Sequence, residues 1–584
     1  MIKLAKILSA ILLSASAGCI SPLPDPPNVI LILTDDQGYG EVAAHGNKSI
    51  QTPHMDALYH EGIRLTDFHV NNVCSPSRAA IMTGKYSTSV GVWHTLGGKN
   101  LLDIEEKTMA DIFRENHYNT FMVGKWHLGD NYPYRPEDRG FDEVFRIGGG
   151  SLGQVADYWG NGLWDGHYWN AREWVQTKGY CTDVQFDAAM EFINKAGDDP
   201  FFLYLATTAP HAPIGAAPEY VEPYLEMGFN KEVSNFYGMV SNIDENLGRL
   251  RSFLQEKGMD KNTLLIFLSD NGSACAKKDS TIYNAGMRGK KGSDYEGGHR
   301  VPCFMYWPEG KLSGGRSVTS LTAHIDLLPT LVDACELTVP ENSRFDGINI
   351  LPMLQGNPRK WPVRVIVSEG KVNNRVKLFS SSCVMSNSWR LVSGTTLFNI
   401  QTDPGQRRAL DNPGKYEEMR QAYIKWHSRV SESFSEEYWF LYADSLSSTP
   451  YVTMDLLPSD INQKPKSVWN QAGVKKGIPD QGVWNIDFPC KDRYTFRLCR
   501  LPLEAEKVNN KKANIKEMQI SGASLVIDGE EVASSETIKN GQVKLNADVT
   551  KGRHRISANF REKDAKKFSA YYLYISREPQ SNED

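Results

Sequence analysis

Residues 28–34 read Asn-Val-Ile-Leu-Ile-Leu-Thr and run directly into Asp35-Asp36. This continuous apolar run follows two prolines and is typical of a strand buried on both faces of a parallel sheet. A second such run, residues 264–269, leads into Asp270-Asn271. Ligands bind outside the carboxyl ends of strands in open α/β sheets, so two oxygen-bearing pairs there indicate a hard-cation site. Ordinary turn chemistry is the competing interpretation, since Asp, Asn and Gly commonly follow strands.

Two more apolar runs end in basic side chains. Residues 120–124 lead into Lys125 and His127, and residues 201–206 lead into His211. A single histidine is more often structural than catalytic, but imidazole titrates near neutral pH and suits proton transfer. Because all four runs alternate with helical segments, the sequence predicts an α/β fold with a mainly parallel sheet sandwiched by helices. The basic groups should then share one sheet edge with the acidic pairs.

Length and charge limit the possible functions. The chain has 584 residues and a formal net charge of −5. This length leaves room for several domains, and this charge does not favour a nucleic-acid-binding protein. After the N-terminal segment, no apolar run approaches the roughly 20 residues that a membrane-spanning helix needs.

Residues 1–19 are predicted to be a signal peptide. Two lysines precede a short apolar stretch, and Ala15-Ser16-Ala17 offers a cleavage site. The segment ends Ser16-Ala17-Gly18-Cys19, which looks like a bacterial lipobox with Ser16 in the place of the usual Leu. We therefore expect an exported protein, periplasmic or anchored to a bacterial membrane by a lipid at Cys19. Simple secretion stays open.

Residues 74–78 read Cys-Ser-Pro-Ser-Arg, and the run continues Ala-Ala-Ile-Met-Thr-Gly. This segment resembles the first signature of type I, formylglycine-dependent sulfatases of the alkaline phosphatase superfamily, with Asn72 in place of a small residue. Residues 117–129 resemble the second signature, with His117 where Gly is common, and residues 208–213 resemble the H-x-P segment. The resemblance covers residues 27–430 and implies the alkaline-phosphatase-like fold.

The resemblance implies that a maturase oxidises Cys74 to formylglycine. One hydroxyl of its hydrate attacks sulfur, and the other then expels sulfate as the aldehyde re-forms. It also implies one calcium ion, which polarises the sulfate. The calcium ligands it implies are Asp35, Asp36, Asp270, Asn271 and the oxygen derived from Cys74.

The same resemblance assigns roles to basic side chains. His127 would take a proton from the formylglycine hydroxyl, and His211 would contact sulfate and protonate the leaving alcohol. Lys125 would bridge the formylglycine oxygen and sulfate, and Arg78 would donate to the hydrate oxygens. Residues 288–298 resemble the family's lysine loop, which places the remaining catalytic lysine at Lys291, with Lys290 as second choice.

An insert and three individual residues bear on the choice of substrate. Residues 148–175 form a glycine- and aromatic-rich insert, and sugar-binding clefts combine aromatic faces with a few polar groups. An ordinary packed loop explains the composition equally well. Ser151 aligns loosely with a sulfate-contacting position in some relatives, and His94 and Arg135 are further predicted contacts of a sugar.

The pattern of predicted helices and strands changes after residue 365. We expect a catalytic domain over residues 27–365, a small C-terminal subdomain over 366–435, and a β-rich, sandwich-like accessory domain over 436–584. Asp528-Gly529 and Asn540-Gly541 are typical hairpin turns of that last part. Cys490 and Cys499 are the pair most suited by spacing to a disulfide.

These observations predict an exported, calcium-dependent sulfatase that acts on a sulfate ester, with a sulfated glycan as the expected substrate. Two alternatives stay open. A formylglycine-dependent phosphodiester or phosphonate monoester hydrolase would use the same machinery on another ester. A non-catalytic glycan-binding lipoprotein would have gaps in the catalytic set, whereas every position here holds a chemically competent residue.

Overall fold

The computed structural model describes residues 25–170, 172–275, 282–357, 361–370, 378–432, 438–443, 451–452, 454–455, 468–479, 482–507, 514–563 and 567–577. The predicted signal peptide, with Cys19, lies outside these residues. Among the helices of the described ranges, none has both the length and the apolar character needed to cross a bilayer.

A ten-stranded sheet forms the centre of the molecule, in the order β11-β2-β10-β9-β1-β8-β4-β5-β6-β7. Its five middle strands are parallel: β9 (Thr263–Ser269), β1 (Asn28–Thr34), β8 (Phe201–Ala206), β4 (Asn119–Gly124) and β5 (Glu143–Arg146). Its outer strands are β10 (Cys303–Tyr306), β2 (Ile63–Leu65), β11 (Arg316–Val318), β6 (His167–Asn170) and β7 (Glu173–Gln176). A short separate pair joins β3 (Phe68–His69) to β12 (Thr322–Ala323).

The apolar residues of β1 supply both faces of this sheet, as a doubly covered strand requires. Val29, Leu31 and Leu33 belong to one core, while Ile30 and Ile32 belong to the other, and all five are fully buried. The first core is covered by α2 (Cys74–Thr83), α3 (Met109–Glu115), α8 (Leu327–Ala334) and α9 (Leu351–Leu354). The second is covered by α1 (Pro53–Glu61), α4 (Cys181–Ala196), α5 (Pro218–Glu226) and α6 (Lys231–Glu256).

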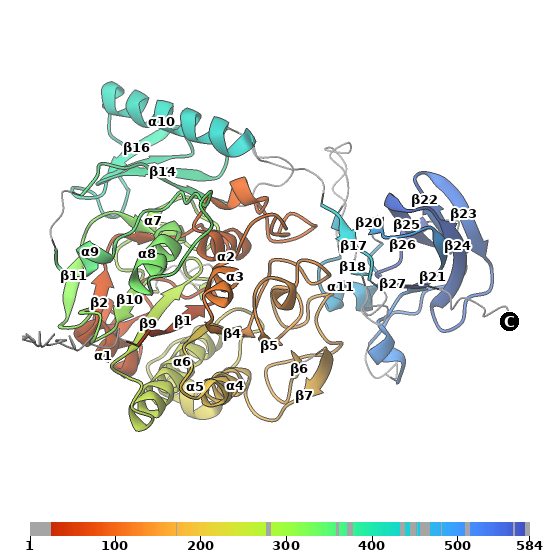
Figure 1. The fold of residues 1–584 in the computed structure, drawn as a ribbon, viewed down its shortest axis with the longest axis horizontal. Coiled ribbons are helices and arrows are strands. Elements are labelled where there is room, and N and C mark those ends of the chain that lie inside the picture. Colours follow the sequence, from red (N-terminus) through yellow and green to blue (C-terminus); the bar gives the residue numbers. More distant parts are fainter. Residues whose placement is uncertain are drawn as a thin grey trace, which may run out of the picture.

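Figure 1 shows α4, α5 and α6 below the sheet and α2, α3 and α8 above it. The predicted fold class, a mainly parallel sheet between helices followed by further β-rich parts, is confirmed by this architecture. The domain limits at residues 365 and 435 stay a prediction.

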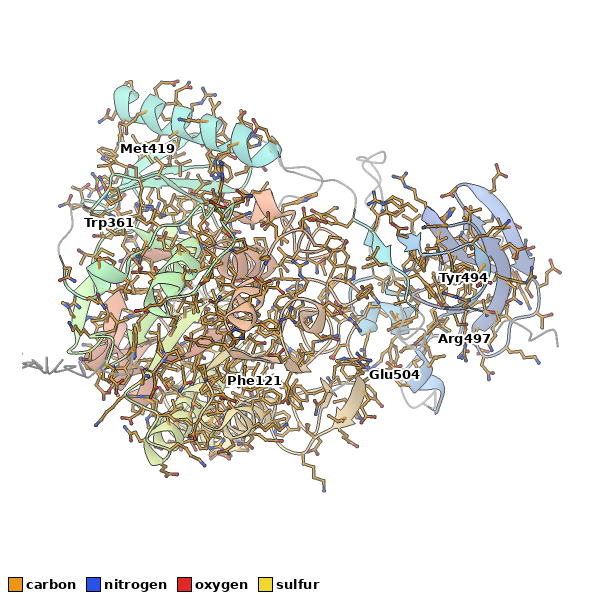
Figure 2. All side chains as sticks on the ribbon, in the orientation of Figure 1. Phe121, Trp361, Met419, Tyr494, Arg497 and Glu504 are labelled. Carbon is orange, nitrogen blue, oxygen red and sulfur yellow. The ribbon has the colours of Figure 1, made fainter. Side chains whose placement is uncertain are left out.

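A smaller antiparallel sheet follows the central sheet along the chain. It consists of β13 (Ile366–Glu369), β14 (Ser382–Ser386), β15 (Trp389–Val392) and β16 (Thr396–Asn399), and α10 (Pro413–Glu432) packs on it. Met419, labelled in Figure 2, lies on α10 and is buried against this sheet.

Arg390 of β15 connects this smaller sheet to the central core. Its Nε donates to Glu296 Oε1 at 2.7 Å, and its Nη2 donates to Asp67 Oδ1 at 2.8 Å. Glu296 begins the short helix α7 (Glu296–His299). Because Arg390 is fully buried, removing it would leave two carboxylates short of their main cation, which typically costs several kcal/mol. The contact therefore fixes the small sheet on the core.

The C-terminal part contains two antiparallel-rich sheets around one core. One comprises β17 (Phe440–Leu441), β19 (Met454–Asp455), β20 (Gly482–Phe488), β22 (Ile520–Ile527), β23 (Glu530–Ser535), β25 (Gly552–Glu562) and β26 (Lys567–Ser569). The other comprises β18 (Tyr451–Val452), β21 (Asp492–Cys499), β24 (Gln542–Val549) and β27 (Tyr572–Arg577). Tyr494, labelled in Figure 2, lies in the shared core. Face-to-face sheets of this kind form a β-sandwich.

The expected disulfide between Cys490 and Cys499 is wrong, since the structure does not join these two sulfurs. Cys490 lies just before β21 and Cys499 is its last residue, so an extended strand separates them. Seven strand steps span roughly 23 Å, whereas disulfide-linked Cα atoms lie within about 7 Å. The spacing argument failed because it did not consider the length of the strand between the two residues.

Candidate active site

Four of the parallel strands end at one edge of the sheet, and each delivers polar groups there. Asp35 and Asp36 follow β1, Asp270 and Asn271 follow β9, Lys125 and His127 follow β4, and His211 follows β8. Since β1 pairs in parallel with both β8 and β9, and β8 with β4, these ends lie side by side. The predicted meeting of the acidic and basic groups is what the structure shows.

The acidic pairs contact each other directly. The Asp36 backbone N–H donates to Asp270 Oδ1 at 3.1 Å, and Asn271 Nδ2 donates to Asp36 Oδ1 at 2.8 Å. Asp36 adopts a φ of 75°, in the left-handed region that Asp tolerates better than most residues. This backbone turn directs both consecutive carboxylates toward the site.

Three cationic side chains compensate these carboxylates. Arg78 of α2 donates to Asp270 Oδ2 through Nε at 3.0 Å and Nη2 at 2.8 Å. Lys125 Nζ donates to Asp35 Oδ2 at 2.8 Å. Lys291 Nζ lies 2.5 Å from Asp36 Oδ1. The lysine predicted from the loop therefore reaches the site, while Lys290, the second choice, is exposed.

Burial and these ion pairs shift the pKa values of Asp35 and Asp36 in opposite directions. Burial raises the pKa of Asp35 to about 7, because it outweighs the opposing charge of Lys125. Burial would also raise the pKa of Asp36, but Lys291 and His211 hold it well below its usual range. The protein's own cations thus satisfy Asp36 more fully than Asp35.

Two oxygens at this edge have features of cation ligands. Asp35 Oδ1 and Asn271 Oδ1 are buried, and neither accepts a hydrogen bond from the residues that the structure describes. Arg78 Nη2 lies 3.9 Å from Asp35 Oδ1. A buried polar atom without a partner is costly, and carboxylate and amide oxygens are the ligands that Ca²⁺ prefers. The donor set therefore fits a hard divalent cation.

His211 also lies close to this donor set. One ligand atom each from Asp35, Asp36 and His211 falls within 4.8 Å of the others. His211 Nε2 is 3.7 Å from Asp36 Oδ2, while Nδ1 donates to the Ala212 carbonyl at 2.7 Å. Its predicted contact with sulfate stays a prediction.

A second buried group with metal-ligand spacing, His69, Glu296 and His299, is engaged internally. Arg390 donates a hydrogen bond to Glu296, and the Nδ1 atoms of His69 and His299 lie 2.9 Å apart. We interpret this group as part of the structural network around Arg390.

Cys74 is the first residue of α2 and is buried beside His127. Cys74 Sγ lies 3.3 Å from His127 Nδ1. His127 Nε2 lies 2.9 Å from the Thr95 carbonyl, which can only accept, so Nε2 carries the proton. Burial, with Lys125 and Arg78 nearby, holds the pKa of His127 well below its usual range. Neutral His127 therefore presents a lone pair to the atom at the Cys74 position, and the α2 N-terminus favours negative charge there.

The three predicted substrate contacts differ in position. Ser151 is buried in the insert, next to Gly150, which packs on the His127 ring. His94 Nδ1 accepts from the backbone N–H groups of the next two residues and shapes its own loop. Arg135 makes two hydrogen bonds to Asp138, at 2.7 and 2.8 Å. Each stays a prediction as a substrate contact.

Sequence reasoning missed three residues that support the site. The Thr95 carbonyl orients His127, and Gly150 leaves room for the His127 ring because it has no side chain. Glu41 is buried beside the acidic pairs and accepts hydrogen bonds from Gly38 and Ser273. Glu41 lies five residues after Asp36, and this proximity was a usable signal. No sequence pattern marks Thr95, because the contact uses its main chain.

Comparison with known proteins places the chain in a family. A family model described as "Sulfatase" matches residues 27–337, and the chain belongs to the sulfatase family. It is 31% identical over 392 residues to "Uncharacterized sulfatase YdeN" of Escherichia coli (strain K12), covering 57% of this chain and 68% of that protein. It is also 31% identical over 386 residues to N-acetylgalactosamine-6-sulfatase of Rattus norvegicus, covering 61% of this chain and 70% of that protein.

Solved structures agree with this assignment. The crystal structure of Ps i-CgsB has a TM-score of 0.63 at 29% identity, covering 71% of this chain and 95% of that one. The same protein in complex with k-i-k-neocarrahexaose has a TM-score of 0.63 at 28% identity, with the same coverage. The protein is therefore an enzyme that hydrolyses sulfuric esters.

Gly150 provides a direct test of how tightly the His127 ring is held. A Cβ at Gly150 would overlap the His127 ring, so Gly150→Ala should displace the imidazole. A displacement of about 1 Å can cost about 10²-fold in rate, and we expect a fall of that order in kcat for an aryl sulfate.

Gly162→Ala is the matched control in the same insert, because a Cβ there meets no atom within 4 Å. Its kcat should equal that of the wild type. A Gly150→Ala enzyme with wild-type kcat would show that the His127 position is not needed for turnover.

Proposed function

We propose that this sulfatase removes sulfate from a sulfated carbohydrate, using formylglycine formed from Cys74 and one bound calcium ion. The observation that carries the proposal is the convergence of Cys74, a neutral His127 at 3.3 Å and a buried oxygen donor set at one sheet edge. The structure holds these groups with fixed cations, so little rearrangement is needed when a sulfate arrives.

Two absent groups would complete the site. Formylglycine at position 74, once hydrated, would supply two hydroxyl groups on one carbon, one as nucleophile and one to release sulfate. Asp35, Asp36, Asp270 and Asn271 would hold the calcium ion, which polarises sulfate and favours ionisation of the hydrate. Asp35 Oδ1 and Asn271 Oδ1, which accept no hydrogen bond from the described residues, support this assignment.

The chain's own residues then carry out three tasks. Arg78 fixes Asp270 through two nitrogens and also donates to the Lys125 carbonyl at 2.7 Å. This rigid fork holds the ends of β9 and β4 together. Lys125 and Lys291 supply positive charge where the sulfate oxygens would lie, and His127 Nδ1 accepts a proton from the group at position 74.

The proposal of a carbohydrate substrate rests on related proteins and on one solved structure. N-acetylgalactosamine-6-sulfatases of several mammals align with this chain at 29–31% identity. Ps i-CgsB is solved with k-i-k-neocarrahexaose, an oligosaccharide. The signal-like segment at residues 1–19 supports our further proposal of an exported enzyme, periplasmic or lipid-anchored at Cys19.

Modification of Cys74 is the first prediction. In protein produced with a formylglycine-generating maturase, peptide mass spectrometry should show oxygen in place of sulfur at Cys74. The peptide with Cys490, a partly exposed free thiol, serves as the internal control and should keep its sulfur. Cys74→Ala should be inactive, and Cys74→Ser should be inactive unless the maturase accepts serine. Full activity with an unmodified Cys74 thiol would contradict the proposal.

Metal removal is the second prediction. Exhaustive chelation should abolish turnover and lower the thermal midpoint, because three buried carboxylates lose their shared cation. A ligand at about 100 times its Kd stabilises the folded state by about 2.7 kcal/mol, so readdition of calcium should raise the midpoint by several degrees.

Asp36→Asn should lose the thermal response to calcium. Asp548→Asn, which alters a largely exposed carboxylate in the C-terminal sandwich, should keep it. Wild-type rates after exhaustive chelation would exclude the metal.

Substrate class is the third prediction. Across a panel of position-defined sulfated mono- and disaccharides, one sugar should exceed small aryl sulfates in kcat/KM by orders of magnitude. The reason is that a site built to pair sugar hydroxyls rejects analogues that lack them. If an aryl sulfate exceeds every sugar in a broad panel, the carbohydrate assignment is wrong while the sulfatase assignment stands.

A further inference from the structure

A hollow beside His127 is built from parts of the chain that are far apart in the sequence. The loop at residues 95–101, the segment 127–131 and the insert at 149–156 form three of its sides. Phe440, Val468 and Trp469, from the C-terminal part, form the fourth. His127 is itself part of the lining, and its Nδ1 lies 3.3 Å from Cys74 Sγ, so the hollow and position 74 share this imidazole.

Trp469 is the large apolar side chain exposed in this wall, with 47% of its surface accessible. Aromatic side chains line many small-molecule sites, and an accessible indole face offers a flat apolar surface on which a ring can stack.

The main chain around Trp469 is nevertheless fixed. The Val155 N–H donates to the Trp469 carbonyl at 3.2 Å, and the Gln471 N–H donates to the Gly153 carbonyl at 3.0 Å. Trp469 therefore belongs structurally to the rim of the site.

Gln471 attaches this segment to the insert. Its buried amide Nε2 donates to the carbonyls of Gln154, Asp157 and Tyr158 at 3.0–3.1 Å, and its Oε1 accepts from the Gly160 N–H at 2.8 Å. Figure 2 shows Glu504, from the neighbouring part of the C-terminal region, at this same junction. A side chain carried on an anchored main chain loses less conformational freedom when a ligand stacks on it than one on a mobile segment, which favours binding.

The charge of the hollow differs from that of the catalytic centre. Asp130 is the one acidic or basic side chain other than His127 among the described lining residues. Asp130 Oδ1 accepts from the Gly149 N–H at 2.7 Å and lies 3.8 Å from Arg146 Nη1. Arg146 also pairs with Glu137. Arg135, paired with Asp138, lies with Arg146 in an adjoining cavity, which shares Asp130, Val155 and Ala156 with the hollow but whose arginines are not part of the hollow's described lining. A sulfate or carboxylate in the hollow would meet the Asp130 carboxylate, with no lysine or arginine among the described residues of the wall.

We propose that Trp469 forms a subsite for the sugar ring that adjoins the sulfated residue, and that this ring carries no charge. The ring stacks on the indole while polar groups such as Asn100, Asn131 and Gln154 face its hydroxyls. The inference rests on the proposed carbohydrate sulfatase function and names the kind of glycan that function serves. The C-terminal sandwich thereby becomes part of substrate recognition.

The test compares kcat/KM for three substrates of the matured, calcium-loaded enzyme. These are a sulfated monosaccharide, the same residue joined to a neutral sugar, and the same residue joined to a uronic acid. The measured quantity is each disaccharide's kcat/KM divided by that of the monosaccharide. For the wild type this ratio should be about ten with the neutral neighbour, equivalent to one good stacking contact. It should be lower with the uronic acid.

Trp469→Ala should lower the neutral-sugar ratio about tenfold, and Trp469→Phe, which keeps an aromatic face, should retain most of it. Leu225→Ala is the control, because Leu225 of α5 is similarly exposed, at 44%, and lies outside both the insert and the described lining of the hollow. Its ratio should be that of the wild type. Thermal midpoints verify folding, and Trp469→Leu replaces the alanine variant if that one unfolds.

Two results would overturn the inference. One is an unchanged neutral-sugar ratio in folded Trp469→Ala or Trp469→Leu enzyme. The other is a wild-type preference for the uronic acid neighbour. Both leave the proposed function intact, since the monosaccharide is still turned over. A wild-type enzyme that releases sulfate from none of the sugars would instead contradict the proposed function itself.

Discussion

Three buried carboxylates at one sheet edge are the constraint on which the rest of this structure depends. Asp35, Asp36 and Asp270 lie where four parallel strands end, all within the protein interior. Unpaired charges in such a place would be prohibitive, so the fold brings buried cations to them. Arg78 comes from a helix, Lys125 from a strand end and Lys291 from a loop more than 160 positions further along the chain. The predicted catalytic set is thus also an electrostatic requirement of the fold.

The buried cations neutralise Asp36 more fully than Asp35, and this difference shapes the chemistry of the site. Asp36 is held ionised by Lys291 and His211, while burial dominates at Asp35 and raises its pKa to about 7. Positive charge is therefore still favourable near Asp35 Oδ1, which accepts no hydrogen bond from the described residues. A divalent cation there would satisfy Asp35 and free Lys125 to interact with an incoming anion. The same arrangement explains why an arginine holds Asp270, since its planar fork stays charged and fixed at any relevant pH.

The central part of this arrangement could be predicted from the sequence, because it depends on local patterns. A buried strand followed by Asp-Asp or Asp-Asn places oxygen ligands at a sheet edge whatever the surrounding residues are. The Cys74 motif and the lysine loop are equally local. Thr95 and Gly150 act through a carbonyl and through the absence of a side chain, so their identity as residues gives little signal. The Cys490–Cys499 expectation failed for the opposite reason, since spacing along the chain says little about distance across a strand.

The rim of the site follows a different rule from its centre. The centre is specified by strand ends, which a parallel sheet brings together in any sequence that folds this way. The rim at the hollow depends on Gln471 reaching an insert more than 300 positions earlier, a contact that no periodicity encodes. Because the centre must bind the sulfate group alone, it has no means of distinguishing one sugar from another. If the substrate is a glycan, as we propose, that discrimination would come from side chains such as Trp469, which the C-terminal part brings to the rim. In this fold, a change of glycan would accordingly require changes in the insert and the C-terminal region, while the strand ends stay as they are.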